Sequence, residues 1–256
     1  MDALIGYTGF VGSTLHEQLG AQALALYNSK NIDEIKGNSF NTIYCAAPRG
    51  VKYLANRDPY GDMIEINNLL NVLKTVKCKL FILISSQDCN ADLTSYEHSL
   101  GEPPTAYGRN RLYFEHEVSR LFDNARIMRI GSLFGKGLKK NVIFDLLNHN
   151  YLENITEDYT LQLYNMEHLL SDIQIMLNEG IRVWNRFSET VWLSDILVLF
   201  SNHSYGNNGH EYNYHINITG KINIDKCYNN RTDYGKLIPR KQALDELATF
   251  IKNYKK

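Results

Sequence analysis

The sequence has no long hydrophobic run, no metal-binding pattern and no excess of charge of either sign. A helix needs about 20 apolar residues to cross a bilayer, and the longest apolar runs here, such as residues 80–84, are far shorter. With 27 Lys and Arg against 28 Asp and Glu, no net field attracts nucleic acid or a membrane surface. The eight histidines show no ligand spacing such as His-Glu-x-x-His, so no metal site is predicted. We therefore expect none of these three partners, and an anionic ligand must meet local basic residues.

Secretion signals and disulfide patterns are also lacking. The N-terminus carries Asp2 and has no basic segment followed by a long apolar one, which argues against a signal peptide. The four cysteines (Cys45, Cys78, Cys89 and Cys227) have no Cys-x-x-Cys spacing. They are typical of reduced thiols in a cytoplasmic protein. A length of 256 residues and a hydrophobic content of 44% fit one α/β domain, or a core with a small cap.

Three glycines near the start mark the first expected site. A short apolar run, residues 3–5, leads to Gly6, Gly9 and Gly12, and residues 13–19 have the spacing of a helix that Gly20 closes. The first glycine permits a tight turn, the second lets the backbone approach a pyrophosphate, and the third lets helix and strand pack closely. The helix N-terminus offers free N–H groups to the phosphates. The predicted dinucleotide-binding residues here are Gly6, Thr8, Gly9, Phe10, Val11 and Gly12.

The second apolar run, residues 23–27, ends in Asn28, Ser29 and Lys30. An acidic residue at this point would bind the ribose 2′-hydroxyl of NAD and repel a 2′-phosphate. Because asparagine, serine and lysine stand here instead, the sequence favours NADP, with NAD as the other possibility. A solvated loop lysine is the alternative interpretation of Lys30.

The remaining apolar runs indicate the fold. Only about eleven residues separate Lys30 from the next strand, residues 42–45, whereas one parallel crossover needs about a dozen. The third unit of a doubly wound sheet is thus expected to be reduced to residues 32–35 or lost. Residues 63–76 have helical spacing, and residues 79–84 form the continuous apolar run of a buried parallel strand. The prediction is an α/β protein with a Rossmann-type doubly wound parallel sheet and a small C-terminal substrate-binding part.

Small and polar residues follow two of these strands. Ala46 and Ala47 end the 42–45 strand and permit a flat ring or a ribose to lie against the backbone; a simple strand end before proline explains them equally well. Ser85, Ser86 and Gln87 follow the 79–84 strand at the carboxyl end of the sheet, where α/β folds place their ligands.

Tyr107 and Arg111 lie one turn apart on one face of a helix expected to run to about residue 122. A fixed cation stabilises a phenolate and lowers the pKa of the tyrosine. A serine hydroxyl across the cleft, such as that of Ser86, can hold a substrate oxygen while the tyrosine gives or takes the proton. A tyrosine and an arginine stacked along a helix surface are the alternative.

These motifs resemble, in order, those of the extended short-chain dehydrogenase/reductase family, which includes nucleotide-sugar epimerases, dehydratases and keto-reductases. The resemblance rests on Gly6-x-x-Gly9-x-x-Gly12, Ala46-Ala47, Ser85-Ser86 and Tyr107-x-x-x-Arg111. Residues 129–135 (R-I-G-S-L-F-G) are similar to the family's R-P-x-N-V-Y-G, and residues 162–169 and 234–247 are similar to its later motifs. The resemblance covers nearly the whole chain.

The resemblance implies roles for the residues of the site. Tyr107 would be the catalytic acid/base, Ser86 would polarise the substrate, and Ser132 would lie beside the nicotinamide. Arg111 would replace the family's lysine, which binds the nicotinamide ribose and lowers the tyrosine pKa. The resulting catalytic set is Ser86, Tyr107 and Arg111, and Ala46, Ala47, Ser85 and Ser132 join the cofactor site.

Three departures from the family pattern matter. Arg111 keeps a permanent charge and can bond ribose hydroxyls, but it does not relay protons as an ammonium can. Gln87 and Asp88 stand where the family's 4,6-dehydratases have Asp and Glu, so dehydration is the least favoured chemistry. Cys89 is one position out of register with a cysteine of some epimerase-reductases, and a structural thiol is the favoured interpretation.

Residues 1–135 are predicted to be the NAD(P)-binding core, and residues 136–256 a small substrate-binding part interleaved with the last core strands and helices. In the family, the loop with Lys139, Lys140 and Asn141 opens the substrate site and can meet a diphosphate; a solvated charge cluster is the alternative. Substrate binding is assigned to Ser86, Gln87, Lys139, Lys140 and Asn141.

The later part of the chain is expected to hold helices at 142–147, 166–177, 192–200 and 242–252, and a strand at 182–187. Residues 201–220 suggest an irregular loop with a short strand at 214–218; its His203, His210 and His215 are interpreted as exposed. A homodimer is expected from the resemblance, formed by the helix around Asn67 and the helix after Tyr107. Leu112, Phe114 and Leu121 are its candidate contacts.

The favoured function is an NADP(H)-dependent oxidoreductase of a nucleotide-activated sugar, most simply a keto-sugar reductase, in surface polysaccharide or deoxysugar biosynthesis. An epimerase with a retained NAD would use the same residues. A non-catalytic NADP-binding regulator of the same fold is the alternative of another class, suggested by Arg111. A scaffold that binds no nucleotide is a third.

Overall fold

The structure, a computed structural model, describes residues 1–20, 24–90, 102–150, 159–201 and 237–254. The expected loop histidines at 203, 210 and 215, the expected strand at 214–218 and Cys227 lie outside the described residues.

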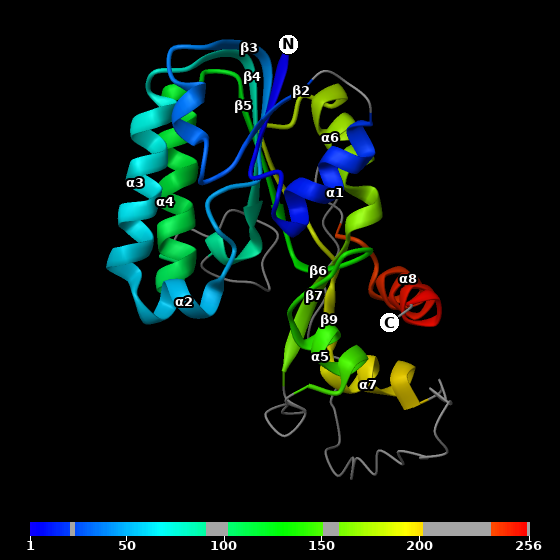
Figure 1. The fold of residues 1–256 in the computed structure, drawn as a ribbon. Coiled ribbons are helices and arrows are strands. Elements are labelled where there is room, and N and C mark those ends of the chain that lie inside the picture. Colours follow the sequence, from blue (N-terminus) through cyan, green and yellow to red (C-terminus); the bar gives the residue numbers. More distant parts are fainter. Residues whose placement is uncertain (21–23, 91–101, 151–158, 202–236, 255–256) are drawn as a thin grey trace.

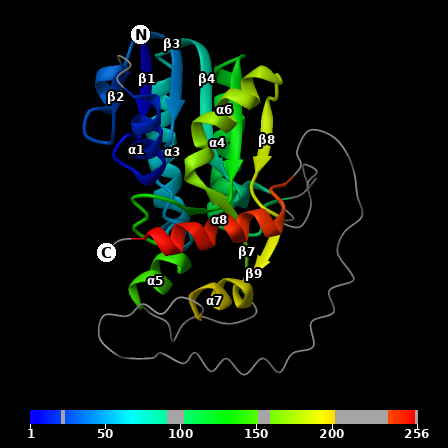
Figure 2. The same ribbon diagram turned by 90° about the vertical axis from the view of Figure 1, so that its right-hand side faces the viewer.

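Six parallel strands form the main sheet, in the order β2-β1-β3-β4-β5-β8 (Figure 2). The strands are β1 (Asp2–Ile5), β2 (Leu24–Tyr27), β3 (Ser39–Cys45), β4 (Lys77–Ser86), β5 (Ala125–Ile130) and β8 (Val183–Arg186). β3 pairs directly with β1, and the connection from β2 contains only the short 3₁₀ helix η1 (Ile32–Ile35). Both the α/β fold and the reduction of the third unit are therefore confirmed.

Helices cover both faces of this sheet (Figure 1). One layer contains α3 (Pro59–Leu73) and α4 (Ala106–Leu121), and the other contains α1 (Phe10–Leu19) and α6 (Leu169–Asn178). Strand side chains alternate between these layers, as the pleat requires. Leu4 belongs to the buried cluster of α1 and α6, whereas Ala3 and Ile5 belong to that of α3 and α4.

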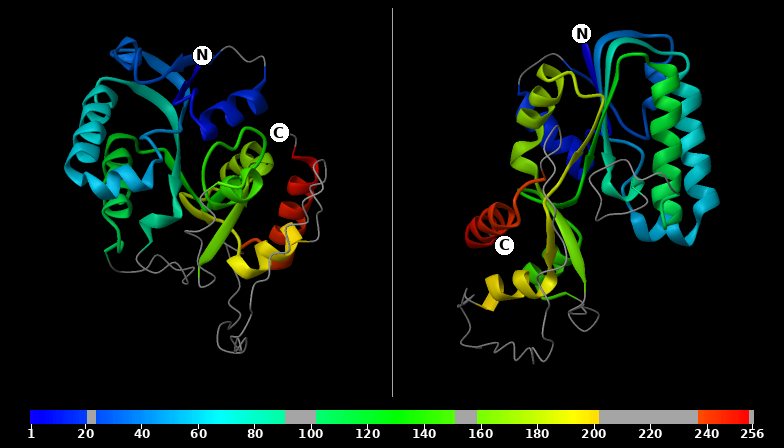
Figure 3. Two further views of the ribbon diagram at one scale, coloured as in Figure 1. Left: turned by 60° about the horizontal axis from the view of Figure 1, so that its bottom comes forward. Right: turned by 180° about the vertical axis from the view of Figure 1, so that it is seen from behind.

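A second, smaller sheet lies beyond the carboxyl ends of the main strands (Figures 1 and 3). It consists of β6 (Ser132–Phe134), β7 (Thr160–Asn165) and β9 (Thr190–Trp192). The helices α5 (Val142–Asn148), α7 (Leu193–Ser201) and α8 (Arg240–Asn253) accompany it. Because β8 and α6 lie with the main sheet, the two parts share one continuous buried cluster. The boundary at residue 135 stays a prediction.

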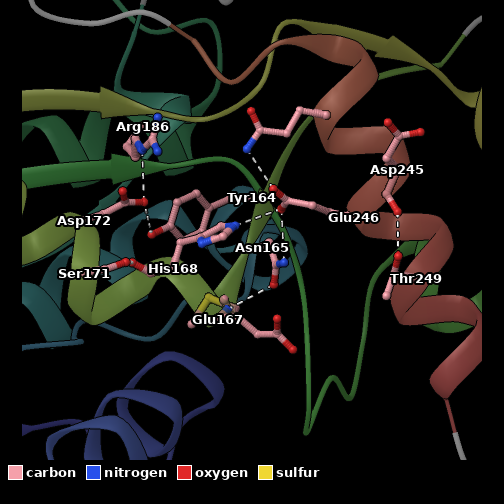
Figure 4. Close-up of polar contacts among 12 residues, drawn as sticks. Tyr164, Asn165, Glu167, His168, Ser171, Asp172, Arg186, Asp245, Glu246 and Thr249 are labelled. Carbon is pink, nitrogen blue, oxygen red and sulfur yellow. Dashed lines mark hydrogen bonds and ion pairs between the residues drawn. The ribbon is translucent and has the colours of Figure 1, made fainter.

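A buried polar cluster ties α8 and β7 to α6 and β8 (Figure 4). The Tyr164 hydroxyl donates to Asp172 at 2.9 Å, and Arg186 forms an ion pair with the same carboxylate at 3.0 Å. Burial, followed by the charge of Asp172, raises the pKa of Tyr164. Nearby, His168 lies 3.0 Å from Glu246 on α8. These contacts fix the small part against the main sheet.

Some boundaries differ from the sequence prediction. α3 begins at Pro59, not at residue 63, because the Asp58 side chain caps it by accepting from the Gly61 N–H at 2.9 Å. The short helix α2 (Lys52–Arg57) and the strand β9 were not expected. Phe114, expected as a dimer contact, is instead almost fully buried in the cluster that α3 and α4 form with the sheet.

Candidate active site

A large cavity of about 1920 Å³ lies at the carboxyl ends of the main strands. Its lining comes from the glycine loop, the ends of β3 and β4, the start of α4, and the small part at residues 131–133, 138–141 and 159–162. A pocket for one drug-sized ligand has about 300–1,000 Å³, so this cavity has room for two ligands side by side.

The glycine loop has the geometry of a phosphate-binding turn. Gly6 has a φ of 86°, and a Cβ there would lie 2.7 Å from the Ala46 carbonyl oxygen. A Cβ on Gly12 would lie 2.1 Å from the Gly6 carbonyl oxygen, so Gly12 supports the turn from behind and is not part of the cavity lining. No side chain caps α1 at Gly9, so its first N–H groups are available to an anion. The residues fit a dinucleotide.

One of the three residues predicted after β2 to bind the cofactor ribose does not line the cavity. Asn28 and Ser29 line the cavity, but Lys30 does not. The Asn28 side chain accepts from the Lys30 backbone N–H at 2.8 Å, which shapes the turn. Lys36, near this end, does line the cavity and is paired with Asp33 at 2.6 Å.

Ser86 and Tyr107 lie near each other in the cavity wall. The Ser86 side chain lies near enough to the Tyr107 phenol to act on its pKa, and both residues line the space. The net pKa of Tyr107 is raised, because burial outweighs the opposing charge of Arg111. This is opposite to the expectation from the Tyr107–Arg111 spacing, which considered the cation but not desolvation.

Asp88 and Lys52 extend this centre, and sequence reasoning gave neither a role there. Ser86 Oγ donates to Asp88 Oδ2 at 3.0 Å, and Lys52 Nζ lies 2.5 Å from Asp88 Oδ1. All three residues line the cavity. The serine–aspartate spacing is typical of local side-chain turns and could have indicated the first contact. Lys52, 36 positions away from Asp88, left no such signal.

Ser85 faces a buried ion pair. Its hydroxyl donates to Glu115 Oε1 at 2.5 Å, and Arg129 binds the same carboxylate through Nε and Nη2. Cys89 lies 3.5 Å from Ser85 Oγ and is almost fully buried. Burial, followed by the charge of Glu115, raises the pKa of the Cys89 thiol, which fits a structural thiol.

All five predicted substrate residues line the same cavity, as does Ser132. Lys140 Nζ crosses the cavity to donate to the Gly50 carbonyl at 3.0 Å. Burial, followed by the charge of Arg49, lowers the pKa of Lys140. Asn141 accepts from the Phe144 N–H at the start of α5 and donates to the Leu133 carbonyl, so its side chain already has a structural task.

Within the described residues, no cluster of three His, Cys, Asp or Glu side chains has a metal-binding arrangement. The described helices are all too short or too polar to span a bilayer.

Comparisons with protein-family models and with curated protein sequences gave no match. Solved structures do match. A UDP-glucuronic acid 4-epimerase from Bacillus cereus, in complex with a UDP-sugar and NAD, has a TM-score of 0.65 and 16% identity over 98% of this chain and 99% of that chain. A dTDP-4-dehydrorhamnose reductase from Clostridium acetobutylicum has a TM-score of 0.61 and 17% identity over 79% of this chain and 80% of that chain.

A UDP-glucose 4-epimerase from Thermotoga maritima, solved with UDP-glucose, gives a TM-score of 0.61 and 13% identity, covering 79% of this chain and 82% of that chain. The protein has the fold of the extended short-chain dehydrogenase/reductases. At these identities the likeness establishes the fold, and the site has to carry the argument for function.

Proposed function

We propose that the protein is an NAD(P)-dependent oxidoreductase that reduces the keto group of a nucleotide-activated sugar. The observation that carries the proposal is the cavity that joins the glycine loop, the Ser86–Tyr107 pair and the lysines at 139 and 140. Such a continuous space suits a dinucleotide at one end and an anionic sugar nucleotide at the other. Structures with the same fold include nucleotide-sugar reductases and epimerases, and we extend their substrate class to this chain.

The cofactor would supply or accept a hydride, and the side chains would handle the proton. Ser86 would hold the sugar oxygen, and Tyr107 would donate the proton to it. A phenol with a raised pKa stays protonated at neutral pH, so it is suited to donate. In the structure the Ser86 hydroxyl donates its one hydrogen to Asp88, so it would have to turn from this carboxylate to donate to a sugar oxygen.

We retain NADP as the favoured cofactor, with NAD as the other possibility. Asn28 and Ser29 leave no carboxylate directly at the end of β2 to repel a 2′-phosphate. Lys36 lines the cavity near this end, where its ion pair with Asp33 offsets part of the positive charge that a phosphate would meet. At the other end, Lys139 and Lys140 would meet the diphosphate of the sugar nucleotide.

The test is a fluorescence titration with NADPH and NADH, followed by turnover with 4-keto nucleotide-sugars. Tyr107→Phe should bind the nucleotide like the native protein but lose about 10²–10⁴-fold in turnover, the usual contribution of a positioned acid. Tyr113→Phe is the matched control, because Tyr113 lies on the same helix and bonds Asn67 at the surface, outside the cavity lining. It should behave like the native protein. If neither nucleotide binds, the site built on the glycine loop is refuted.

An epimerase with a retained NAD is the second candidate, because Ser86 and Tyr107 would serve it as well. It would release NAD on denaturation and would not consume added NADPH. A regulator of the same fold would bind nucleotide reversibly without any turnover. Surface polysaccharide or deoxysugar biosynthesis, in the cytoplasm, is the setting we propose for the reductase.

We further propose a homodimer through the outer surfaces of α2–α4. Phe114 is buried and Leu112 and Leu121 are half-buried, so they leave little for a partner. The exposed apolar side chains of this region are Tyr53, Leu54, Tyr60, Ile64 and Tyr113. Sedimentation of the native protein and of Ile64→Asp would test this contact, and a monomeric native protein would refute it.

A further inference from the structure

Arg111 is held by more contacts than its place in the motif suggests. Its side chain is only 4% exposed. Nη1 donates to Asp62 Oδ2 at 2.9 Å, and Nη2 donates to Asp62 Oδ1 at 2.8 Å. Nη2 also donates to the Arg49 carbonyl at 2.7 Å, and the guanidinium carbon lies 4.4 Å from the centre of the Tyr107 ring.

Asp62 is the centre of this arrangement. Its carboxylate accepts from both terminal nitrogens of Arg111 and from Asn110 Nδ2 at 2.9 Å. A bidentate arginine–carboxylate pair fixes both partners in one plane and is among the strongest polar contacts in proteins. Asp62 thereby joins α3 to the first turns of α4, which carry Tyr107.

These contacts leave Arg111 little to offer a ribose. The Nε atom is enclosed and has no hydrogen-bond partner within the described part of the chain, so a ligand cannot reach it without rearrangement. The other two nitrogens carry four N–H groups, of which two donate to Asp62 and one to the Arg49 carbonyl, so one N–H of Nη1 is left for a ligand where Arg111 borders the cavity. A lysine, with one compact ammonium, could not form this bidentate pair.

The Arg49 carbonyl belongs to residues 46–51, the loop that lines the cavity beside Tyr107. A Cβ on Gly50 would lie 3.9 Å from the Tyr107 hydroxyl, so this loop forms the wall next to the phenol. The Gly50 carbonyl accepts from Lys140 across the cavity. Two successive carbonyls of the loop thus accept hydrogen bonds: that of Arg49 from Arg111, and that of Gly50 from Lys140.

We propose that Asp62 and Arg111 form a positioning pair, which holds the 46–51 loop and the Tyr107 ring in place for the nucleotide, and that Arg111 is not itself a ribose ligand. The proposal rests on the proposed function, since it takes the cavity to be a nicotinamide nucleotide site. It adds Asp62 to the residues of the site and assigns Arg111 a task that lysine cannot perform.

Nucleotide affinity separates the two roles of Arg111. NADPH and NADH are titrated against the native protein, Asp62→Asn, Arg111→Lys and the double variant. Glu117→Gln and Arg120→Lys are matched controls, because they alter an exposed ion pair on α4. Thermal unfolding verifies that each variant is folded at the titration temperature. Should Asp62→Asn be unfolded, Asp62→Glu keeps the charge while it displaces the carboxylate.

If Asp62 and Arg111 form a positioning pair, Asp62→Asn and Arg111→Lys should each weaken nucleotide binding by about tenfold. Each variant loses one or more of the charge-assisted hydrogen bonds that hold the loop. The double variant should bind no worse than either single variant, since both remove the same support. If Arg111 instead binds the ribose directly, Arg111→Lys should retain the native nucleotide affinity, and Asp62→Asn should not reduce that affinity. Either result would overturn the proposal.

A second readout does not need any ligand. NMR of the ¹³C-labelled tyrosine ring, assigned by Tyr107→Phe, reports ionisation of Tyr107. This side chain faces Arg111 on its own helix, Ser86 at the end of β4, and Asp88 and Cys89 just after it. Asp62→Asn should lower the pKa of Tyr107, because the charge of Arg111 is no longer neutralised. An unchanged Tyr107 signal in this variant would contradict the pair. If the native protein binds no nucleotide, the proposed function fails while this readout still decides whether the pair exists.

Discussion

The buried ion pair beneath Ser85 provides the sharpest stability prediction. Arg129 and Glu115 are each less than 10% exposed and are joined by contacts of 2.6–3.1 Å, and Arg129 also donates to Asn90 Oδ1 at 2.8 Å. Glu115→Gln keeps the shape of the side chain but removes its charge, which leaves the guanidinium of Arg129 buried without a counter-charge. Breaking a buried pair in this way costs about 3–5 kcal/mol.

For a chain of 256 residues, each kcal/mol lowers Tm by about 2–4 °C. Glu115→Gln should therefore lower Tm by roughly 6–20 °C in a thermal unfolding experiment. The control is Glu117→Gln, two residues along α4, whose partner Arg120 is largely exposed. That pair is worth about 0.5 kcal/mol, so its loss should change Tm by only about 1–2 °C.

The double variant Glu115→Gln/Arg129→Met tests the physical cause. If the unpaired charge of Arg129 is what destabilises Glu115→Gln, replacing Arg129 by methionine should restore part of the lost Tm. The uncharged side chains that replace Glu115 and Arg129 need no buried counter-ion. Equal Tm values for Glu115→Gln and Glu117→Gln would refute the reasoning. So would a double variant that is less stable than Glu115→Gln alone.

Other measurements test the remaining parts of the structure. Gly12→Ala should abolish nucleotide binding in a fluorescence titration, because its Cβ would lie 2.1 Å from the Gly6 carbonyl oxygen and displace the loop. Gly20→Ala meets no atom within 4 Å but is strained by its φ of 69°, so it should lower Tm and still bind the nucleotide when folded. Burial acts to raise the pKa of Glu246, but hydrogen bonds, including one with His168, outweigh it and lower that pKa. The stabilisation is therefore present above the ordinary pKa of about 4.5 and is lost as the pH falls below it, so Glu246→Gln should flatten the acid side of a Tm–pH profile.

Much of the fold could be predicted because its strands are marked locally. β4 is a nearly continuous apolar run and α6 has apolar residues at helical spacing, so each could be recognised without its neighbours. α2 has only Ala55 buried, and β9 has only three residues, so neither presents a period that a sequence can reveal. Their structure depends on partners that are distant in the chain.

The candidate site shows the same division. The glycines and the Tyr107 motif could be found from spacing alone, because their geometry is contained within one turn or one helix. The partner of Arg111 could not, since Asp62 lies 49 residues earlier. The pKa direction of Tyr107 also depends on burial, which no spacing shows. Spacing revealed which groups are near one another along the chain, and packing determined how they act.

The groups around Ser86 bear on which of the three chemistries the cavity suits. Dehydration needs an acid for the leaving hydroxyl as well as a base, but Gln87 is an amide, and Asp88 is occupied by Ser86 and Lys52. Epimerisation would use Tyr107 first as a base and then as an acid, whereas the raised pKa of Tyr107 favours its protonated form at the start of the reaction. Reduction needs only one protonated donor beside a hydroxyl that holds the oxygen. Tyr107 would be that donor and Ser86 that hydroxyl, so we keep reduction as the proposed chemistry and epimerisation as the second candidate.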